Sequence, residues 1–197
     1  MIIGIAGLIG HGKGTVATIL EQHHKFVKLS FADSLKDSVA AVFNWNRLWL
    51  EGATTESRIW REQVDEWWSQ RLKIPNLTPR IVLQQWGTEV CRRGFHDDIW
   101  IASLENKIHG YQNQNYNIVI PDVRFPNEID MIQNMNGKVW LVKRGQDPQW
   151  LREYIDQDIQ PIDIHQSEWA WAKSQFDQVI LNDGSLDDLK NKIINLV

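Results

Sequence analysis

Cysteine is almost absent from this sequence, and that scarcity limits what the chain can be. The 197 residues include one cysteine, Cys91, so an intramolecular disulfide and a cysteine-based metal site are both excluded. No apolar run approaches the ~18 residues that a membrane span needs, and no basic segment followed by a cleavable apolar stretch opens the chain. We therefore expect a cytoplasmic protein with no membrane partner.

An excess of basic charge is also lacking. The chain has 21 Lys and Arg against 25 Asp and Glu, which gives a formal net charge of −4. A surface that holds nucleic acid by neutralising phosphates needs the opposite balance, so we expect no nucleic-acid partner. An anionic substrate must instead meet a local basic pocket. The length and the 43% hydrophobic content are typical of one globular domain over residues 1–197.

Short apolar runs alternate with helical patterns along most of the chain. Residues 1–6 form an apolar run that ends at a glycine, as in a strand buried on both faces of a parallel sheet. Similar strand-like runs cover residues 26–31, 116–121, 138–143 and 178–181. This alternation predicts an α/β fold of about five mostly parallel strands with helices on both faces. Residues 44–110 contain no convincing strand and are expected to form a helical insertion within the same domain.

The most informative segment is a glycine-rich loop that follows the first predicted strand and precedes a predicted helix. Glycines occur at positions 7, 10, 12 and 14, where they allow backbone N–H groups to turn inward around phosphate oxygens. The following helix directs its positive dipole end at the same anion, and Lys13 supplies a mobile charge for the phosphates. The predicted nucleotide-binding residues are Gly10, His11, Gly12, Lys13, Gly14 and Thr15. We expect His11 to be exposed to solvent.

The loop departs from the general phosphate-loop pattern at one position. Gly14 separates Lys13 from the hydroxyl residue Thr15, and this Gly-Lys-Gly-Thr variant resembles the loop of adenylate kinase and other nucleoside monophosphate kinases. Thr15 is therefore a candidate Mg²⁺ ligand either directly or through water.

A second candidate region is the predicted helix that begins at Thr78, with Thr78 as its N-cap and a proline at the first helical position. On an α-helix Arg80, Gln84 and Thr88 share one polar stripe. The opposite, core-facing side is expected to carry Val82, Leu83, Trp86 and Val90. The stripe is either a solvated face or part of a binding site. Gly87 favours the binding site, because a glycine inside a helix often marks close approach by a ligand or by another backbone.

Two polar residues follow the strand-like run 116–121. Asp122 and Arg124 are expected beyond the carboxyl end of that strand, where parallel sheets bind ligands. Asp122 could hold a water of a Mg²⁺ ion or a sugar hydroxyl, and Arg124 could grip a phosphate with two hydrogen bonds. The alternative is an ordinary Asp–Arg ion pair that closes a turn. Asp33, after the second predicted strand, is either similarly placed or a helix N-cap.

Tryptophan is abundant, with 11 residues, and most of those in the helical stretch are expected to pack in a core. One or two could stack on a base. Arg58 and Arg61 lie near them in a charged helical segment. They are either solvated helix residues or arginines that close over a transferring phosphate.

Taken in order, these motifs resemble the bacteriophage deoxynucleoside monophosphate kinases, a branch of the P-loop kinases. The similarity spans nearly the whole chain. It rests on the glycine loop and on residues 31–36, 80–88, 97–100, 121–128, 165–168 and 182–186. The resemblance implies the three-layer P-loop NTPase fold, ATP with Mg²⁺ as the phosphoryl donor, and a homodimer. It also implies that the substrate pocket is lined by Arg80, Gly87, Thr88, Trp100, Asp122, Arg124 and Glu128, with Arg61 as a further phosphate ligand.

These observations predict a kinase that transfers the γ-phosphoryl group of ATP to a deoxynucleoside monophosphate for DNA precursor synthesis. Lys13, Arg61 and Arg124 are the expected catalytic residues, and Arg58 and Gln84 join the substrate-binding set. Thr15 and Asp122 are the expected metal ligands. The helical insertion would carry part of the acceptor site, in the host cytoplasm if the chain is of phage origin. The rivals are another small-molecule P-loop kinase, of the dephospho-coenzyme A or shikimate type, and an ATPase that uses water as acceptor.

Overall fold

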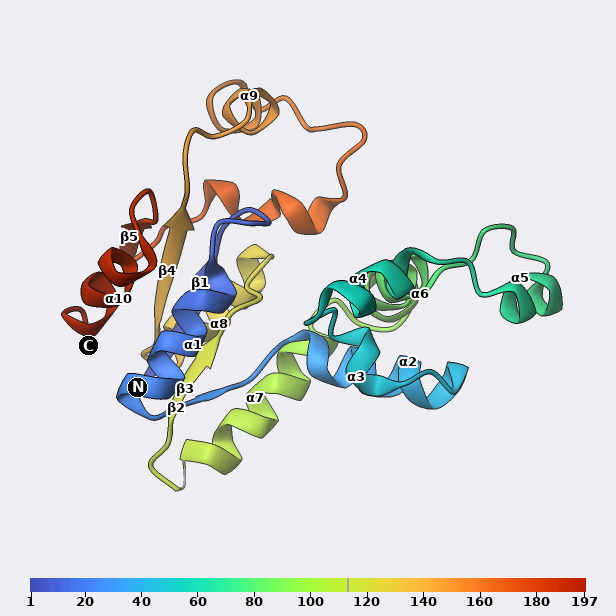
Figure 1. Cartoon of the computed structure of the whole chain (residues 1–197), viewed down its shortest axis with the longest axis horizontal. Coiled ribbons are helices and arrows are strands. Elements are labelled where there is room, and N and C mark those ends of the chain that lie inside the picture. The colour runs from blue at the N-terminus through green and yellow to red at the C-terminus, as the bar shows by residue number, and fades with distance from the viewer. Residues whose placement is uncertain (113) are drawn as a thin grey trace. The chain divides into compact units, whose positions relative to one another are not determined.

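The computed structural model describes residues 1–112 and 114–197. Two compact units make up the chain (Figure 1). The first unit contains residues 1–30 and 104–197, and the second contains residues 31–103. The helical stretch expected over residues 44–110 overlaps most of the second unit.

A five-stranded sheet forms the centre of the first unit. Its order is β2-β3-β1-β4-β5, and all neighbouring strands are parallel. The strands are β1 (Ile2–Ala6), β2 (Phe26–Lys28), β3 (Asn117–Ile120), β4 (Lys138–Lys143) and β5 (Gln178–Leu181). The predicted α/β fold is confirmed, and every strand lies within a run that the apolar pattern indicated.

Helices cover both faces of this sheet (Figure 1). Alternate residues of β1 point to opposite faces. Ile3 and Ile5 join a buried cluster with α1 and α10. On the other face, a Cβ added to Gly4 would lie 2.6 Å from Ile132 Cδ1 in α8. The helices of the first unit are α1 (Lys13–His24), α8 (Pro126–Asn134), α9 (Gln149–Gln157), α10 (Leu186–Ile194) and the short 3₁₀ helices η2 (Gln166–Glu168) and η3 (Ala170–Lys173). The helix α7 (Ile99–Gln112) begins in the second unit and ends in the first.

The second unit is helical throughout its regular structure. Its elements are α2 (Ala32–Phe43), α3 (Arg47–Leu50), α4 (Thr55–Glu62), α5 (Glu66–Leu72), α6 (Pro79–Gln84) and the π-helix η1 (Gln85–Arg93). Its core contains Val39, Phe43, Leu50, Leu77 and Val82, and several tryptophans pack against this core. Phe43 stacks on Trp45 with ring centroids 4.6 Å apart. Trp60, Trp68 and Trp86 pack there as expected, whereas Trp67 is 63% exposed.

The helix expected after Thr78 changes type along its length. It is α-helical to Gln84 and then π-helical, with i→i+5 hydrogen bonds, as far as Arg93. The wider turn alters which side chains share a face. Val82 is buried as predicted, but the prediction of a core position for Val90 is wrong, because Val90 is 49% exposed. The expected α-helical stripe therefore does not continue unchanged to Thr88, which lies in the π segment.

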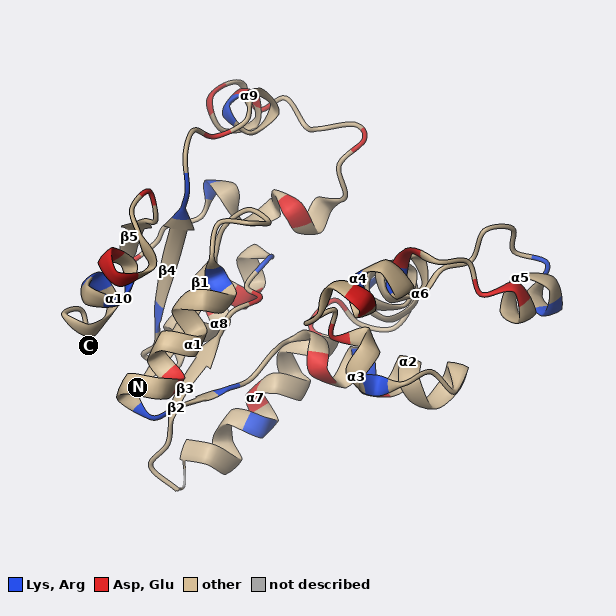
Figure 2. Cartoon of the chain, in the orientation of Figure 1, with Lys and Arg blue, Asp and Glu red and all other residues tan. Residues whose placement is uncertain are grey.

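Surface charge is mixed on the helices of both units. In α5 and α10, acidic and basic residues lie on the same short helix (Figure 2).

Among the residues described, none of the helices has the length and apolar character that a membrane span requires.

Candidate functional site

The glycine loop links β1 to α1 and has three glycines with positive φ, at positions 7, 10 and 12, and two of them also lie close to other atoms. Gly7 has φ +139°, and a Cβ there would lie 2.4 Å from the carbonyl oxygen of Val142 in β4. Gly12 is the N-cap of α1 with φ +99°, and its Cβ would lie 2.5 Å from Asn182 Nδ2. Both positions combine positive φ with close approach, so a side chain at either would distort the loop.

The N-terminus of α1 is open to an anion. No side chain caps it, and its first turn contains no acidic residue. A Cβ added to Gly14 would meet nothing within 4 Å among the atoms described. Helix N-termini leave backbone N–H groups without intrahelical partners and carry a partial positive charge. This end of α1 therefore fits a phosphate group.

Lys13 is folded back over the loop. Its Nζ donates to the carbonyl oxygens of Gly7 at 2.7 Å and Leu8 at 2.9 Å. Burial is the main reason that the pKa of Lys13 falls from 10.5 to about 8, and the positive charge of Arg124 lowers it further. Glu168 and Asp122 act in the opposite direction. Arg124, Glu168 and Asp122 thus all lie within electrostatic range of Lys13.

His11 is buried, so the prediction of solvent exposure is wrong. Its side chain is 9% exposed, and Nδ1 lies 3.2 Å from the carbonyl oxygen of Val142. The carbonyl oxygen of His11 accepts a hydrogen bond from Asn182 Nδ2 at 2.9 Å. The ends of β4 and β5 therefore both hold the middle of the loop, through contacts that are distant in sequence.

Asp122 follows β3, and Ser30 follows the neighbouring strand β2. Ser30 Oγ donates to Asp122 Oδ2 at 2.6 Å, so the serine fixes the carboxylate at the carboxyl edge of the sheet. No group of three or more His, Cys, Asp or Glu residues that could hold a metal ion occurs in the described part of the chain. Mg²⁺ is commonly held by one or two carboxylates together with substrate phosphates. The donor set of Asp122 and the Thr15 hydroxyl fits that mode of binding.

Arg124 forms its ion pair with Glu168, whereas the alternative interpretation of the sequence expected an ion pair with Asp122. Its Nη1 donates to Glu168 Oε1 at 2.9 Å and to Ser167 Oγ at 3.2 Å. The Arg124 side chain is 45% exposed and the Glu168 side chain is 27% exposed. The ion pair is therefore partly shielded from water, and Arg124 remains accessible.

Glu128 is buried at the start of α8. Its Oε2 accepts the backbone N–H of Arg124 at 2.6 Å and that of Phe125 at 3.1 Å. These bonds satisfy N–H groups at the helix N-terminus. Glu128, predicted to line the pocket, thus holds the backbone of Arg124 in place.

In the second unit, Thr78 caps α6 as predicted, because its side chain accepts the N–H of Ile81 at 3.2 Å. On α6, Arg80 Nη1 contacts Glu62 Oε1 at 3.1 Å in an exposed pair. Gln84 lies half-buried at the end of the same helix. Such exposed ion pairs contribute little to stability, so Arg80 can exchange its partner at small cost.

Gly87 is buried in the π-helix, and the space that a Cβ would take there is filled by a side chain. A Cβ there would lie 2.9 Å from Leu35 Cδ2 in α2. The carbonyl oxygen of Gly87 accepts the indole N–H of Trp100 at 2.9 Å. Two predicted pocket residues, Gly87 and Trp100, are therefore in direct contact. The π-helix itself is a rare element that occurs often at functional sites.

Arg58 and Arg61 both bind backbone carbonyls at the end of α3. Arg58 donates to Gly52 O at 2.9 Å and to Ala53 O at 3.2 Å. Arg61 Nη1 lies 3.3 Å from Glu51 O. In the described structure both arginines hold this turn, and their predicted action on phosphate stays a prediction.

The predicted site residues thus form two groups, one in each unit. The first unit holds Gly10, His11, Gly12, Lys13, Gly14, Thr15, Asp122, Arg124 and Glu128, and the second holds Arg58, Arg61, Arg80, Gln84, Gly87, Thr88 and Trp100. Sequence reasoning gave no role to Ser30, Glu168 or Asn182. Glu168 and Asn182 lie within the stretches 165–168 and 182–186 that carry the family resemblance, and Ser30 directly precedes the stretch 31–36. Only the tertiary structure joins each of them to a site residue.

The family model described as deoxynucleotide monophosphate kinase matches residues 54–193. A protein of Acanthamoeba polyphaga mimivirus, provisionally named a deoxynucleotide monophosphate kinase, is 29% identical over all of this chain and 96% of its own length. The deoxynucleoside-5′-monophosphate kinase of Escherichia phage T5 is 40% identical over 60 residues, which are 30% of this chain and 23% of that protein.

A solved structure also resembles the chain. Dephospho-CoA kinase from Campylobacter jejuni has a TM-score of 0.52 and 14% identity, and the match covers 99% of this chain and 94% of that one. At this identity the likeness concerns the fold alone.

Proposed function

The chain belongs to the deoxynucleotide monophosphate kinase family, and from that premise we propose that it transfers the γ-phosphoryl group of ATP to the 5′-phosphate of a deoxynucleoside monophosphate. An oxygen of the acceptor phosphate attacks the γ-phosphorus, the bond to the β-phosphate oxygen breaks, and ADP and a deoxynucleoside diphosphate are formed. The family match over residues 54–193 carries this proposal. The glycine loop supports it independently, because it precedes the matched segment.

The residues of the first unit suit this chemistry. The transferring phosphoryl group carries dispersed negative charge, and catalysis needs positioned positive charge more than covalent help. The uncapped end of α1 and the Lys13 ammonium would hold the donor phosphates. Arg124 extends from the turn after β3 and would stabilise the group in transfer. Such an arginine can contribute 10³–10⁵ in rate.

We further propose Mg²⁺ as the metal, held through Asp122 and Thr15 directly or through water. When bound, it would neutralise charge on the β- and γ-phosphates. The protein's own part is to hold the Asp122 carboxylate in place, which Ser30 does at 2.6 Å. The family resemblance also supports a homodimer, which sedimentation equilibrium tests.

The residues of the second unit are proposed to bind the acceptor. Gly87 and Trp100 would lie against the nucleoside monophosphate, and Arg80 would exchange Glu62 for a phosphate. The rival acceptors, dephospho-coenzyme A and shikimate, are favoured only by the fold-level likeness to dephospho-CoA kinase.

The decisive experiment is an ADP-release assay with ATP and each deoxynucleoside and ribonucleoside monophosphate, with dephospho-coenzyme A and shikimate alongside. We expect ADP release that depends on a deoxynucleoside monophosphate. Arg124→Ala should lower turnover by about 10³-fold or more. The matched control Arg152→Ala removes an exposed arginine of α9 and should leave turnover unchanged. ADP release that ignores every monophosphate would instead identify an ATPase, and product from another acceptor would identify the rival kinase.

A further inference from the structure

The guanidinium of Arg124 is held through one of its three nitrogen atoms. Both of its side-chain hydrogen bonds leave from Nη1, one to Ser167 Oγ and one to Glu168 Oε1. Within the described residues, Nε and Nη2 of Arg124 have no protein partner. Both acceptors belong to the short helix η2, which no expectation from sequence assigned a role.

This arrangement leaves one edge of the guanidinium intact. The group is planar and presents five N–H donors in a fixed fork. Ser167 and Glu168 take up the two N–H groups of Nη1. The remaining edge, formed by Nε and Nη2, matches two oxygens of a phosphate. The clamp therefore orients the arginine without competing for that edge.

The carboxylate of Glu168 comes from an anchored turn. The backbone N–H of Glu168 donates to His165 O at 2.9 Å, and its carbonyl oxygen accepts the indole N–H of Trp171 at 3.0 Å. Trp171 is 4% exposed, so the anchor itself is buried. A carboxylate on such a turn is held in one direction.

The Ser167 hydroxyl has a defined direction as well. The backbone N–H of Ser167 lies 3.3 Å from His165 Nδ1, so this nitrogen is an acceptor. Ser167 Oγ lies 2.9 Å from the same Nδ1 and can donate its own hydrogen there. The lone pairs of the hydroxyl then remain for Arg124. His165, Ser167 and Glu168 thus form one hydrogen-bonded support for the arginine.

From these contacts we propose that Glu168 is a positioning residue, which with Ser167 holds the guanidinium of Arg124 so that its Nε–Nη2 edge meets the phosphoryl group in transfer. The inference rests on the proposed function, because it takes Arg124 as the group that stabilises this transfer. In this proposal Glu168 acts through Arg124 and not on the substrate.

A double-mutant cycle tests whether Glu168 acts through Arg124. Glu168→Gln keeps the size of the side chain and removes its charge, and we expect kcat to fall about 10- to 100-fold, as for lost charged or supporting hydrogen bonds. The KM for ATP should change less than about twofold. In the Arg124→Ala background the same substitution should cost less than about twofold, because the group it positions is gone. An equal loss of kcat in both backgrounds would overturn the proposal, and so would unchanged kcat in the parent.

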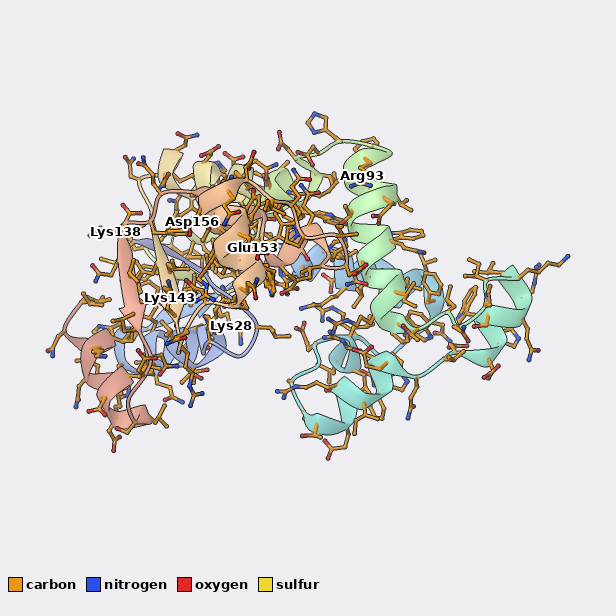
Figure 3. All side chains as sticks on the ribbon, turned by 90° about the horizontal axis from the view of Figure 1, so that it is seen from above. Lys28, Arg93, Lys138, Lys143, Glu153 and Asp156 are labelled. Atoms are coloured by element: carbon orange, nitrogen blue, oxygen red, sulfur yellow. The ribbon has the colours of Figure 1, made fainter. Side chains whose placement is uncertain are left out.

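The matched control is Glu153→Gln on α9, where Glu153 is labelled in Figure 3 and contacts Gln149. It should leave kcat within about twofold of the parent. Thermal unfolding of both variants separates loss of folding from loss of rate.

A second measurement does not depend on activity. NMR of arginine side chains in the ligand-free protein should show slowed rotation of the Arg124 guanidinium, with distinct Nη1 and Nη2 signals. Glu168→Gln should average these signals, and Glu153→Gln should not. Identical Arg124 signals in the parent and Glu168→Gln would refute the clamp. If the parent forms no diphosphate, the proposed function fails while this measurement still decides whether Glu168 holds Arg124.

Discussion

Raising the pH is expected to stabilise the ligand-free protein and to weaken nucleotide binding, and Lys13 is the reason for both effects. Its pKa is about 8 in the folded chain, against 10.5 for an ordinary lysine, chiefly because of burial. At ~1.4 kcal/mol per pKa unit, this difference lowers the free energy of unfolding by ~3 kcal/mol while Lys13 is charged. The folded state carries this cost in full below pH 8, where Lys13 is charged. The cost is relieved as the pH rises from 8 toward 10.5, because the unfolded chain then binds more protons.

The affinity for nucleotide has the opposite pH dependence. Phosphate groups are fully ionised above pH ~7, since their second pKa is about 6. They favour the charged form of Lys13, so binding above pH 8 must take up a proton. The affinity should therefore fall by up to about tenfold per pH unit between pH 8 and pH 10.

Calorimetric titration with ADP in the presence of a chelator measures this effect without a metal ion. Lys13→Arg is the matched control, because an arginine stays charged over the whole range. The variant should show a nearly constant ADP affinity from pH 7 to pH 9.5, whatever its absolute value. Constant affinity in the parent, or an equal loss in Lys13→Arg, would show that Lys13 does not titrate near pH 8.

Two further substitutions test the loop and the π-helix. Gly7→Ala should destabilise the protein by about 2–5 kcal/mol, because it combines positive φ with a Cβ 2.4 Å from a carbonyl oxygen. The control is Gly110→Ala, where the added Cβ meets open space, and this variant should be neutral or stabilising. Thermal unfolding compares the two variants. Trp100→Phe removes the N–H that the carbonyl oxygen of Gly87 accepts, at a cost of about 1–3 kcal/mol. The KM for the deoxynucleoside monophosphate should rise several-fold while the KM for ATP stays the same, and a rise in both would place Trp100 outside the acceptor site.

The strands were predictable because their signal is local. Each is an apolar run bounded by polar residues or glycine, and in a parallel sheet buried on both faces such runs stand out. The bounds of β4 and β5 coincide with the runs 138–143 and 178–181. The glycine loop was equally visible, since the positive φ values of Gly7 and Gly12 leave a direct trace in the sequence.

The failures arise where distant parts of the chain decide the outcome. His11 is buried because β4 supplies a carbonyl 131 residues away, and Asn182, which follows β5, holds the backbone of His11 from 171 residues away. Neither contact has a local signature. Val90 is exposed because α6 continues as a π-helix, which shifts every later side chain around the axis. A helical pattern with 3.6 residues per turn does not predict that shift.

Two fixed carboxylates explain how the first unit keeps two cations close together without a ligand. Lys13 and Arg124 repel each other, and that repulsion contributes to the lowered pKa of Lys13. Glu168 and Asp122 offset part of it, and each is held by other groups, Glu168 by its buried turn and Asp122 by Ser30. A phosphate that arrives between the cations would relieve the remaining repulsion with little rearrangement of the protein. Binding energy can then be directed to the phosphoryl group in transfer rather than spent on ordering the site.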